Sequence, residues 1–238
     1  MRLAPAGIRE WGGGAVLTVA IVGGSWWLLP VAWVNWTITA VMVVLWCATA
    51  AFFRDPYRRP CTSLGIGAMI SPADGTITAI EHVADHECVD GPAIIVRIFL
   101  SVLNVHINRT PCALQIIRTD YRPGRFLDAR SEASAKVNEC NLIFCRRDDG
   151  LLLGVRQVSG AIARRIVCPM QSGDRFARGI RFGMIKFGST TELIVPDRDD
   201  VAVHVAVGDR VSGAVTMLAE VPWSGSAAPS RQESPSTH

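Results

Sequence analysis

Lysine is almost absent from the chain. Of the 24 lysine and arginine residues, only Lys136 and Lys186 are lysines. Neither lies in a recognisable cofactor-binding context, and no glycine-rich phosphate loop is visible. Enzymes that use pyridoxal phosphate need a lysine to hold the cofactor and a cradle for its phosphate. The scarcity of lysine therefore argues against that class of enzyme.

Metal-binding and disulfide patterns are also missing. The seven cysteines include no C-x-x-C pair, and the closest two are Cys140 and Cys145. The five histidines lack the spacing of metal ligands. An odd number of unpaired cysteines is typical of reduced thiols in a cytosolic domain. The sequence thus predicts neither a metal site nor a disulfide framework.

Formal charge is absent from residues 15–53. This run is too long for one membrane span and suits two short ones, with a turn near Pro30 and Asn35. Arginines flank both ends, which favours a hairpin over residues 1–53 with both ends in the cytoplasm. A signal peptide is the alternative, but the apolar length and the lack of a small-residue cleavage pattern argue against it. Four tryptophans cluster near the turn, as in an aromatic belt: Trp26, Trp27, Trp33 and Trp36.

The charges outside this run are unevenly distributed. Residues 1–188 carry 21 basic and 14 acidic side chains, a net charge of +7, whereas residues 189–238 carry 3 and 7, a net charge of −4. A basic large segment suits an anionic membrane surface, and a solvated basic face is the alternative. We expect no nucleic-acid partner.

Short runs rich in β-branched residues follow the apolar segment, separated by Gly, Pro or Asp. They predict a mainly β (α+β) soluble domain over residues 54–223, similar to a barrel or sandwich. Residues 158–166 also allow a short helix. Residues 201–221 contain V-G-D-x-V, a pattern of lipoyl- and biotinyl-carrier barrels, but no lysine stands at the attachment turn. The Ser-, Pro- and Ala-rich tail, residues 224–238, is predicted to be disordered.

Four ordered segments carry polar residues that suggest chemistry. They are S-P-A-D-G at 71–75, L-S-V-L-N-V-H-I-N-R-T-P at 100–111, R-Q-V-S-G-A-I-A-R-R-I-V-C at 156–168 and R-F-G-M-I-K-F-G-S-T-T at 181–191. Taken singly, a Gly-Ser pair or an Asp-Gly pair is an ordinary turn, and a histidine between apolar residues is an ordinary strand residue. Together and in this order, from about residue 52 to about residue 221, they resemble the short-form phosphatidylserine decarboxylase proenzymes.

The resemblance implies that the chain cleaves itself between Gly188 and Ser189 and converts Ser189 into a covalent pyruvoyl group. A large chain, 1–188, and a small chain, 189–238, would then remain together as a heterodimer. Serine is a weak nucleophile, so it needs a base and a group that orients the base. The resemblance assigns these roles to His106 and Asp74. The glycine admits strained backbone angles and leaves its carbonyl open to attack.

Two positions depart from the family pattern. Long-form members have H-x-x-H where this chain has His106 and Arg109, so the roles of two histidines would fall on His106, and the step it serves stays open. Thr190 stands where short-form members usually have arginine, as in the L-G-S-T of the long form. It is either a donor to the oxyanion or only the start of a strand. Arg109 is a candidate for binding the substrate phosphate or carboxylate, with a structural ion pair as the alternative.

The function implied is a decarboxylase at the cytoplasmic face of the cell membrane that converts phosphatidylserine, an anionic aminophospholipid, to phosphatidylethanolamine and CO2. One alternative is the same chemistry on another serine phospholipid, such as ether-linked archaetidylserine. Another is a non-catalytic, membrane-anchored barrel scaffold with an intact Gly188–Ser189 bond. Because the proposed cleavage residues all follow Phe53, we expect loss of the hairpin to affect membrane attachment more than cleavage.

Overall fold

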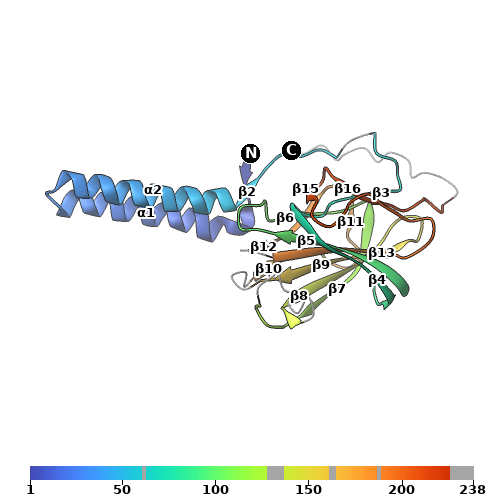
Figure 1. Ribbon diagram of the computed structural model, residues 1–238. Helices are drawn as coiled ribbons and strands as arrows, with labels where there is room; N and C mark the ends of the chain where they lie inside the picture. The colour runs from blue at the N-terminus through green and yellow to red at the C-terminus, as the bar shows by residue number, and fades with distance from the viewer. Residues whose placement is uncertain (61–62, 128–136, 161–164, 187–188, 226–238) are drawn as a thin grey trace.

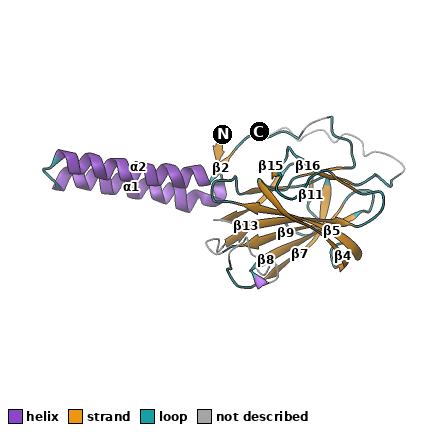
Figure 2. Ribbon diagram, in the orientation of Figure 1, coloured by secondary structure: helices purple, strands orange, loops and turns teal. Residues whose placement is uncertain are grey.

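The computed structural model describes residues 1–60, 63–127, 137–160, 165–186 and 189–225. A helical hairpin projects from one end of a β domain (Figure 1). The hairpin consists of α1 (Ile8–Leu28), preceded by the short 3-10 helix η1 (Pro5–Gly7), and of α2 (Ala32–Phe52). The β domain is built from strands and loops (Figure 2).

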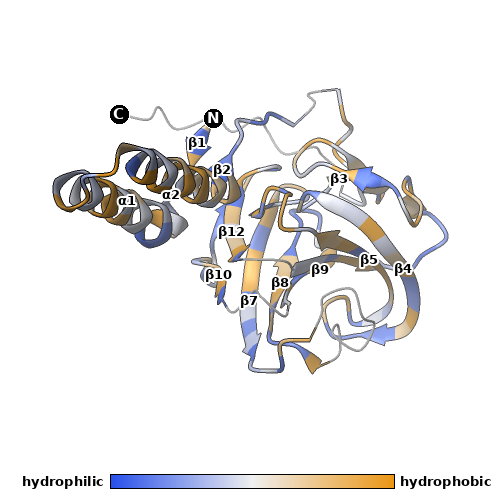
Figure 3. Ribbon diagram, turned by 60° about the vertical axis from the view of Figure 1, so that its left-hand side comes forward, coloured by the Kyte–Doolittle hydropathy of each residue, from blue (hydrophilic) through white to orange (hydrophobic). Residues whose placement is uncertain are grey.

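Apolar residues recur along both helices of the hairpin (Figure 3). Residues 5–28 and 32–52 are both long and apolar enough to cross a membrane, and only 6% of the apolar window of each is buried inside the protein. Asn35 closes the connection by donating from Nδ2 to the Leu29 carbonyl at 3.0 Å. Trp27 and Trp33, beside this turn, are 85% and 73% exposed. The predicted pair of apolar helices is confirmed.

The largest sheet has eight antiparallel strands, in the order β11-β7-β8-β9-β13-β5-β4-β15. Their bounds, in the same order, are Arg175–Phe176, Leu114–Arg122, Cys140–Arg146, Leu152–Ser159, Ser189–Pro196, Gly91–Leu100, Gly75–His86 and Arg210–Val211. The strand β13 is central because it pairs along its length with β5 and with β9. The strand that begins at Ser189 is therefore held on both sides by strands from the segment that precedes it.

Three smaller sheets complete the described strands. One has the order β10 (Arg165–Val167), β12 (Arg181–Lys186), β6 (Ile107–Arg109), and another has the order β14 (Ala202–Val203), β16 (Met217–Glu220), β3 (Ala68–Ile70). The third pairs β1 (Arg2–Leu3) with β2 (Arg54–Asp55). The main core lies on one face of the large sheet, where alternate residues of the central strands, such as Ile98, Val155 and Leu193, are buried.

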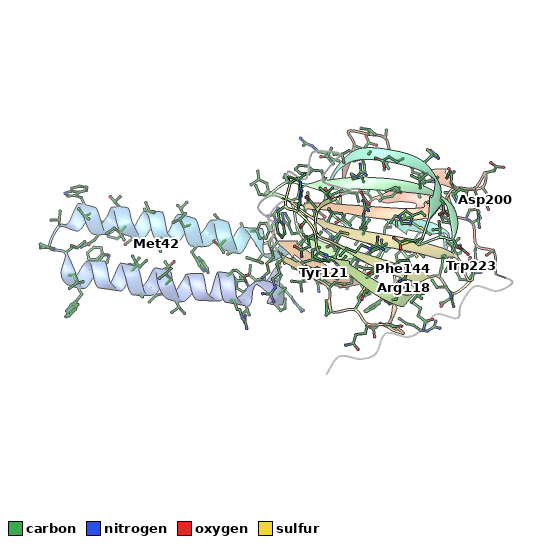
Figure 4. The ribbon with its side chains drawn as sticks, turned by 90° about the horizontal axis from the view of Figure 1, so that it is seen from below. Met42, Arg118, Tyr121, Phe144, Asp200 and Trp223 are labelled. Carbon is green, nitrogen blue, oxygen red and sulfur yellow. The ribbon has the colours of Figure 1, made fainter. Side chains whose placement is uncertain are left out.

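The predicted mainly β class is confirmed, but barrel closure is not. The described strands form open sheets with edges, and residues 201–221 are divided between two of them. The sequence also allowed a short helix over residues 158–166, but the described part of this range is not helical: β9 ends at Ser159 and β10 begins at Arg165. Residues 161–164 lie outside the described residues. The same is true of residues 226–238 of the predicted disordered tail. Figure 4 shows Met42 along the hairpin, and Asp200 and Trp223 at the opposite end of the molecule.

The foot of the hairpin packs directly on the β domain. A second core cluster joins Phe52 and Phe53 to Val105, Ile107 and Met184, which lie on or beside β6 and β12. On α1, the carboxylate of Glu10 forms an ion pair with Lys186 at the end of β12. The hairpin is thus attached to the strand that leads into the proposed cleavage segment.

Candidate active site

Ser189 is a fully buried residue at the first position of β13. Its Cα lies opposite Leu100 of β5 and Ser159 of β9. Its Oγ is buried and has no hydrogen-bond partner among the described residues, and the same is true of the Ser159 Oγ. A buried hydroxyl without a partner costs free energy, so its retention suggests a chemical use. Gly188 lies outside the described residues.

The chain brings His106 next to the strand that precedes Ser189. His106 immediately precedes β6, which pairs with β12, and the Ile185 amide donates to the His106 carbonyl at 3.3 Å. The last residue of β12 is Lys186, two residues before Gly188. Two segments about 80 residues apart in sequence are therefore adjacent in the fold.

His106 is buried, and its environment favours the neutral ring. Its Nδ1 lies 3.0 Å from the Asn104 carbonyl oxygen, which can only accept, so Nδ1 carries the proton and Nε2 is left as the acceptor. The Phe52 ring lies against it, with centroids 4.2 Å apart. Burial lowers the pKa of His106 to about 4, with Arg54 acting in the same direction and the Asn104 hydrogen bond and Asp74 opposing it.

Asp74 lies in the turn before β4, and its carboxylate is held by other groups. Its Oδ2 accepts from the Arg58 Nη2 at 2.7 Å, and its Oδ1 accepts from the Gly213 amide at 2.8 Å and from the Arg58 Nη1. The group at Nδ1 of His106 is the Asn104 carbonyl rather than Asp74. Asp74 therefore influences the ring through its charge, which raises the pKa of His106.

Thr190 and Arg109, the other two candidates, are both buried. Thr190 follows Ser189 on β13, so its side chain lies on the opposite face of the sheet. Arg109 donates to Asp55 Oδ1 at 3.0 Å and to the carbonyls of Pro56 and Gly179. The bonds to Asp55 and Pro56 tie β6 to the segment that follows the hairpin, and the bond to Gly179 ties it to the segment before β12.

A buried polar chain beside Ser189 was not predicted from the sequence. Asn108 Nδ2 donates to Thr191 Oγ1 at 3.0 Å, Gln157 Nε2 donates to Asn108 Oδ1 at 2.8 Å, and Asn141 Nδ2 donates to Gln157 Oε1 at 3.2 Å. It links β13, β6, β9 and β8 on the face that also carries Ser189. In the sequence, each of these residues is marked only as a polar side chain at a strand position that faces the apolar core. Many strands contain such a residue, so this signal is too weak to predict the chain of hydrogen bonds.

The described residues therefore combine an unpartnered serine hydroxyl with an uncharged histidine on the neighbouring segment. The Ser189 Oγ makes no hydrogen bond to the ring in this structure, but a neutral ring within hydrogen-bond reach of it could take the hydroxyl proton and activate the oxygen as a nucleophile. Among the residues that the structure describes, no group of three or more His, Cys, Asp or Glu side chains could hold a metal ion.

Comparison with known proteins assigns the chain to a family. The model of the phosphatidylserine decarboxylase family matches residues 47–219. The chain belongs to this family. A relative from Rhodopirellula baltica is 38% identical over 206 residues, which cover 85% of this chain and 80% of the relative. One from Symbiobacterium thermophilum is 41% identical over 189 residues, 79% of this chain and 86% of the relative.

A third relative, from Syntrophus aciditrophicus, is 39% identical over 181 residues, which cover 76% of this chain and 81% of the relative. All three relatives are named phosphatidylserine decarboxylase proenzyme. The family match begins within α2 and ends within β16, so it includes the foot of the hairpin as well as nearly all of the β domain. The resemblance inferred from the four motifs is confirmed.

Proposed function

We propose that the chain is a self-processing, pyruvoyl-dependent decarboxylase that converts phosphatidylserine to phosphatidylethanolamine and CO2 at a membrane surface. The observation that carries the proposal is the buried, unpartnered hydroxyl of Ser189 at the start of the central strand, next to the segment of His106. Membership of the phosphatidylserine decarboxylase family supports it.

Self-cleavage begins at the bond between Gly188 and Ser189. His106 takes the hydroxyl proton at Nε2, the Ser189 Oγ bonds to the Gly188 carbonyl carbon, and the peptide C–N bond breaks as its nitrogen receives that proton. Removal of the Ser189 α-proton then breaks the Cβ–Oγ bond and releases residues 1–188 as a carboxylate. Water then replaces the nitrogen of the remaining dehydroalanine. The nitrogen leaves as ammonia, and the residue becomes the pyruvoyl group.

The residues around position 189 fit a buried carbonyl group. Ser159, opposite Ser189 in the sheet, has an Oγ without a partner among the described residues, so it offers a hydrogen-bond donor at this position. A pyruvoyl group supplies a carbonyl that accepts the electron pair left when CO2 departs, without a lysine. The burial of Ser189 shields this position from bulk solvent.

The neighbouring residues position these groups. We propose that the Asn104 carbonyl orients the His106 ring, and that Asp74, held by Arg58, acts through its charge. Arg109 positions β6 through Asp55 rather than binding substrate. Thr190 has a structural role as the second residue of β13 rather than a role as oxyanion donor, since its side chain lies on the face away from Ser189.

The cleaved chains stay together as a heterodimer, since β13 of the small chain lies between β5 and β9 of the large chain. We propose that the hairpin anchors the β domain at the cytoplasmic face of the cell membrane, because arginines flank both of its ends.

Serine phospholipids such as archaetidylserine share the headgroup of phosphatidylserine, so parallel assays on both lipids decide between these substrates.

A trapping experiment tests the substrate and the site together. Borohydride added during turnover should fix the lipid amine to the chain that begins at position 189. Peptide mass spectrometry should place the adduct on its first residue. Adducts on Lys136 or Lys186 instead, or turnover of free serine as fast as of the lipid, would contradict the proposal.

A further inference from the structure

A groove lies between the last turn of α2 and the loop that follows β5. It has a volume of about 360 Å³ and is lined by Ala48, Thr49, Ala51, Phe52, Arg54, Val102 and Leu103. Except for Thr49 and Arg54, these side chains are apolar. These residues place the groove at the foot of the hairpin. At this point α2 reaches the β domain (Figure 1).

The outer wall of the groove exposes apolar side chains in a fixed turn. Val102 and Leu103 are 47% and 80% exposed. Asn104 Oδ1 accepts from the Ser101 amide at 2.9 Å and from the Ser101 Oγ at 2.8 Å, and these bonds close the turn. Apolar side chains held outward beside a membrane-type helix are suited to contact with lipid chains.

Arg54 spans the two walls and keeps donors for a ligand. It donates from Nη1 to the Ala51 carbonyl at 2.8 Å and from Nη2 to the Leu103 carbonyl. These bonds use two of the five N–H groups of a guanidinium. Arg54 has no carboxylate partner among the described residues, whereas Arg58 and Arg109 pair with Asp74 and Asp55.

The groove ends next to the candidate base. Phe52 lines the groove and also stacks on His106, with ring centroids 4.2 Å apart. From the outside inward, the groove therefore offers an apolar wall, a cation and the region of His106. A serine phospholipid has the same sequence of groups, namely acyl chains, a phosphodiester and an amino acid.

We infer that this groove holds the lipid substrate, with Arg54 binding the phosphodiester and with Leu103 and the last turn of α2 contacting the lipid next to it. This inference rests on the proposed decarboxylase function. Arginine binds phosphate with paired, charge-assisted hydrogen bonds, and its remaining donors suit this task. The headgroup beyond the phosphate would then reach Ser189 past Phe52.

Two other hollows at this end of the molecule fit a lipid less well. One, of about 190 Å³, lies between the N-terminal residues and β12, and its two charged lining residues, Asp55 and Arg181, pair with each other. The other, of about 440 Å³, is lined by five arginines, and three of them, Arg58, Arg109 and Arg181, pair with Asp55 or Asp74. Neither is lined by Phe52, which contacts His106.

Kinetics of the full-length protein in phosphatidylserine micelles test the role of Arg54. Arg54→Gln should raise KM about tenfold or more through loss of charge-assisted bonds, with little change in kcat. Arg59→Gln, which removes a nearby exposed arginine, should leave KM unchanged. Leu103→Ser should raise KM for long-chain lipid but not for dibutyroyl phosphatidylserine. An unchanged KM in self-cleaved Arg54→Gln, or an equal rise in Arg59→Gln, would overturn the assignment.

A cross-linking experiment on the unmutated protein tests whether the lipid lies in this groove, even if Arg54→Gln fails to cleave itself. Phosphatidylserine with a diazirine near the glycerol end of an acyl chain is fixed to the small chain with borohydride and then irradiated. Cross-links should fall on residues 48–54 and 101–104. Cross-links on residues 4–6, 167–169 or 178–181 would overturn the groove assignment alone. Absence of any lipid on the small chain would instead contradict the proposed decarboxylase function.

Discussion

The protonation of His106 is the residue-level property on which the proposed self-cleavage depends. Burial lowers the pKa of this ring to about 4, and the positive charge of Arg54 adds to the effect. The neutral, proton-accepting form therefore predominates above that pH. We expect the cleavage rate of the newly folded precursor to stay nearly constant from about pH 8 to about pH 5 and to fall as the pH approaches 4.

Time courses of chain cleavage across this pH range provide the measurement. Arg54→Gln removes the positive neighbour, so its rate should begin to fall at a higher pH than that of the unmutated protein. A fall centred near pH 6.5, the value of an unperturbed histidine, would show that His106 is not the base or is not buried in the precursor.

Substitution of the base and of its charged neighbour should have unequal effects. His106→Ala should remain a single chain, because the Ser189 hydroxyl loses its proton acceptor. Asp74→Asn should only slow cleavage, since the Asn104 carbonyl still orients the ring. Gel electrophoresis resolves the chains. Normal cleavage of His106→Ala without decarboxylation would assign the ring to the second reaction, and normal behaviour of both variants would remove them from the site.

The candidate nucleophile and base could be proposed from the sequence because they lie in long, ordered motifs. Their partners were not predictable, since they come from distant segments. Arg58 reaches Asp74 from the linker after the hairpin, and Asp55 reaches Arg109 in the same way. The Asn104 carbonyl is a backbone group, and a sequence gives no sign of which ring nitrogen it binds.

Among the elements, the hairpin is more closely attached to the site than its sequence suggested. We expected its removal to affect membrane attachment more than cleavage. However, Phe52 stacks on His106, and Glu10 pairs with Lys186 just before the cleavage segment. We now expect deletion of residues 1–53 to slow cleavage markedly as well, because the His106 loop loses the ring that covers it.

A point substitution isolates this contact from membrane binding. Lys186→Ala should slow cleavage and lower the free energy of unfolding by about 2 kcal/mol, because Lys186 is buried and its bond to Glu10 is charge-assisted. Arg175→Ala is the matched control, since it breaks an exposed ion pair with Asp148 far from the hairpin. Equal cleavage rates in the two variants would show that the hairpin contact does not support the site.

The elements themselves were largely predictable, but their order in the sheets was not. Apolar length identified the two helices, and β-branched runs separated by turn residues identified most strands. Sheet order depends on contacts between segments far apart in sequence, such as β13 with β5 and β9. No local pattern shows that the strand beginning at Ser189 is central, or that β6 lies beside β12.

At the scale of the whole molecule, contacts between the two proposed chains continue to the C-terminal end of the described residues. Arg147 donates to the carbonyls of Val221 and Pro222 at 2.8 Å each and lies 5.1 Å from the Trp223 ring. It also pairs with Asp149 at 2.6 Å. Together with the pairing of β13, these bonds should keep the small chain bound after cleavage.

We therefore expect the two chains to elute together from a sizing column without denaturant. Arg147→Ala should lower the free energy of unfolding by about 3 kcal/mol, since it removes the donor from the Val221 and Pro222 carbonyls and leaves the buried Asp149 carboxylate without its positive partner. Although burial opposes it, the Arg147 hydrogen bond holds the pKa of Asp149 well below its usual range. The stability from this pair is thus present above about pH 4 and lost as the pH falls further, which acid unfolding of both proteins measures.

The intact mass of the purified protein tests the central claim most directly. The account predicts two chains, residues 1–188 and 189–238, with the smaller blocked at its N-terminus by a pyruvoyl group. Ser189→Ala should give one uncleaved, inactive chain of otherwise normal fold. An unmutated protein that decarboxylates phosphatidylserine while its mass shows a single uncleaved chain would contradict the account.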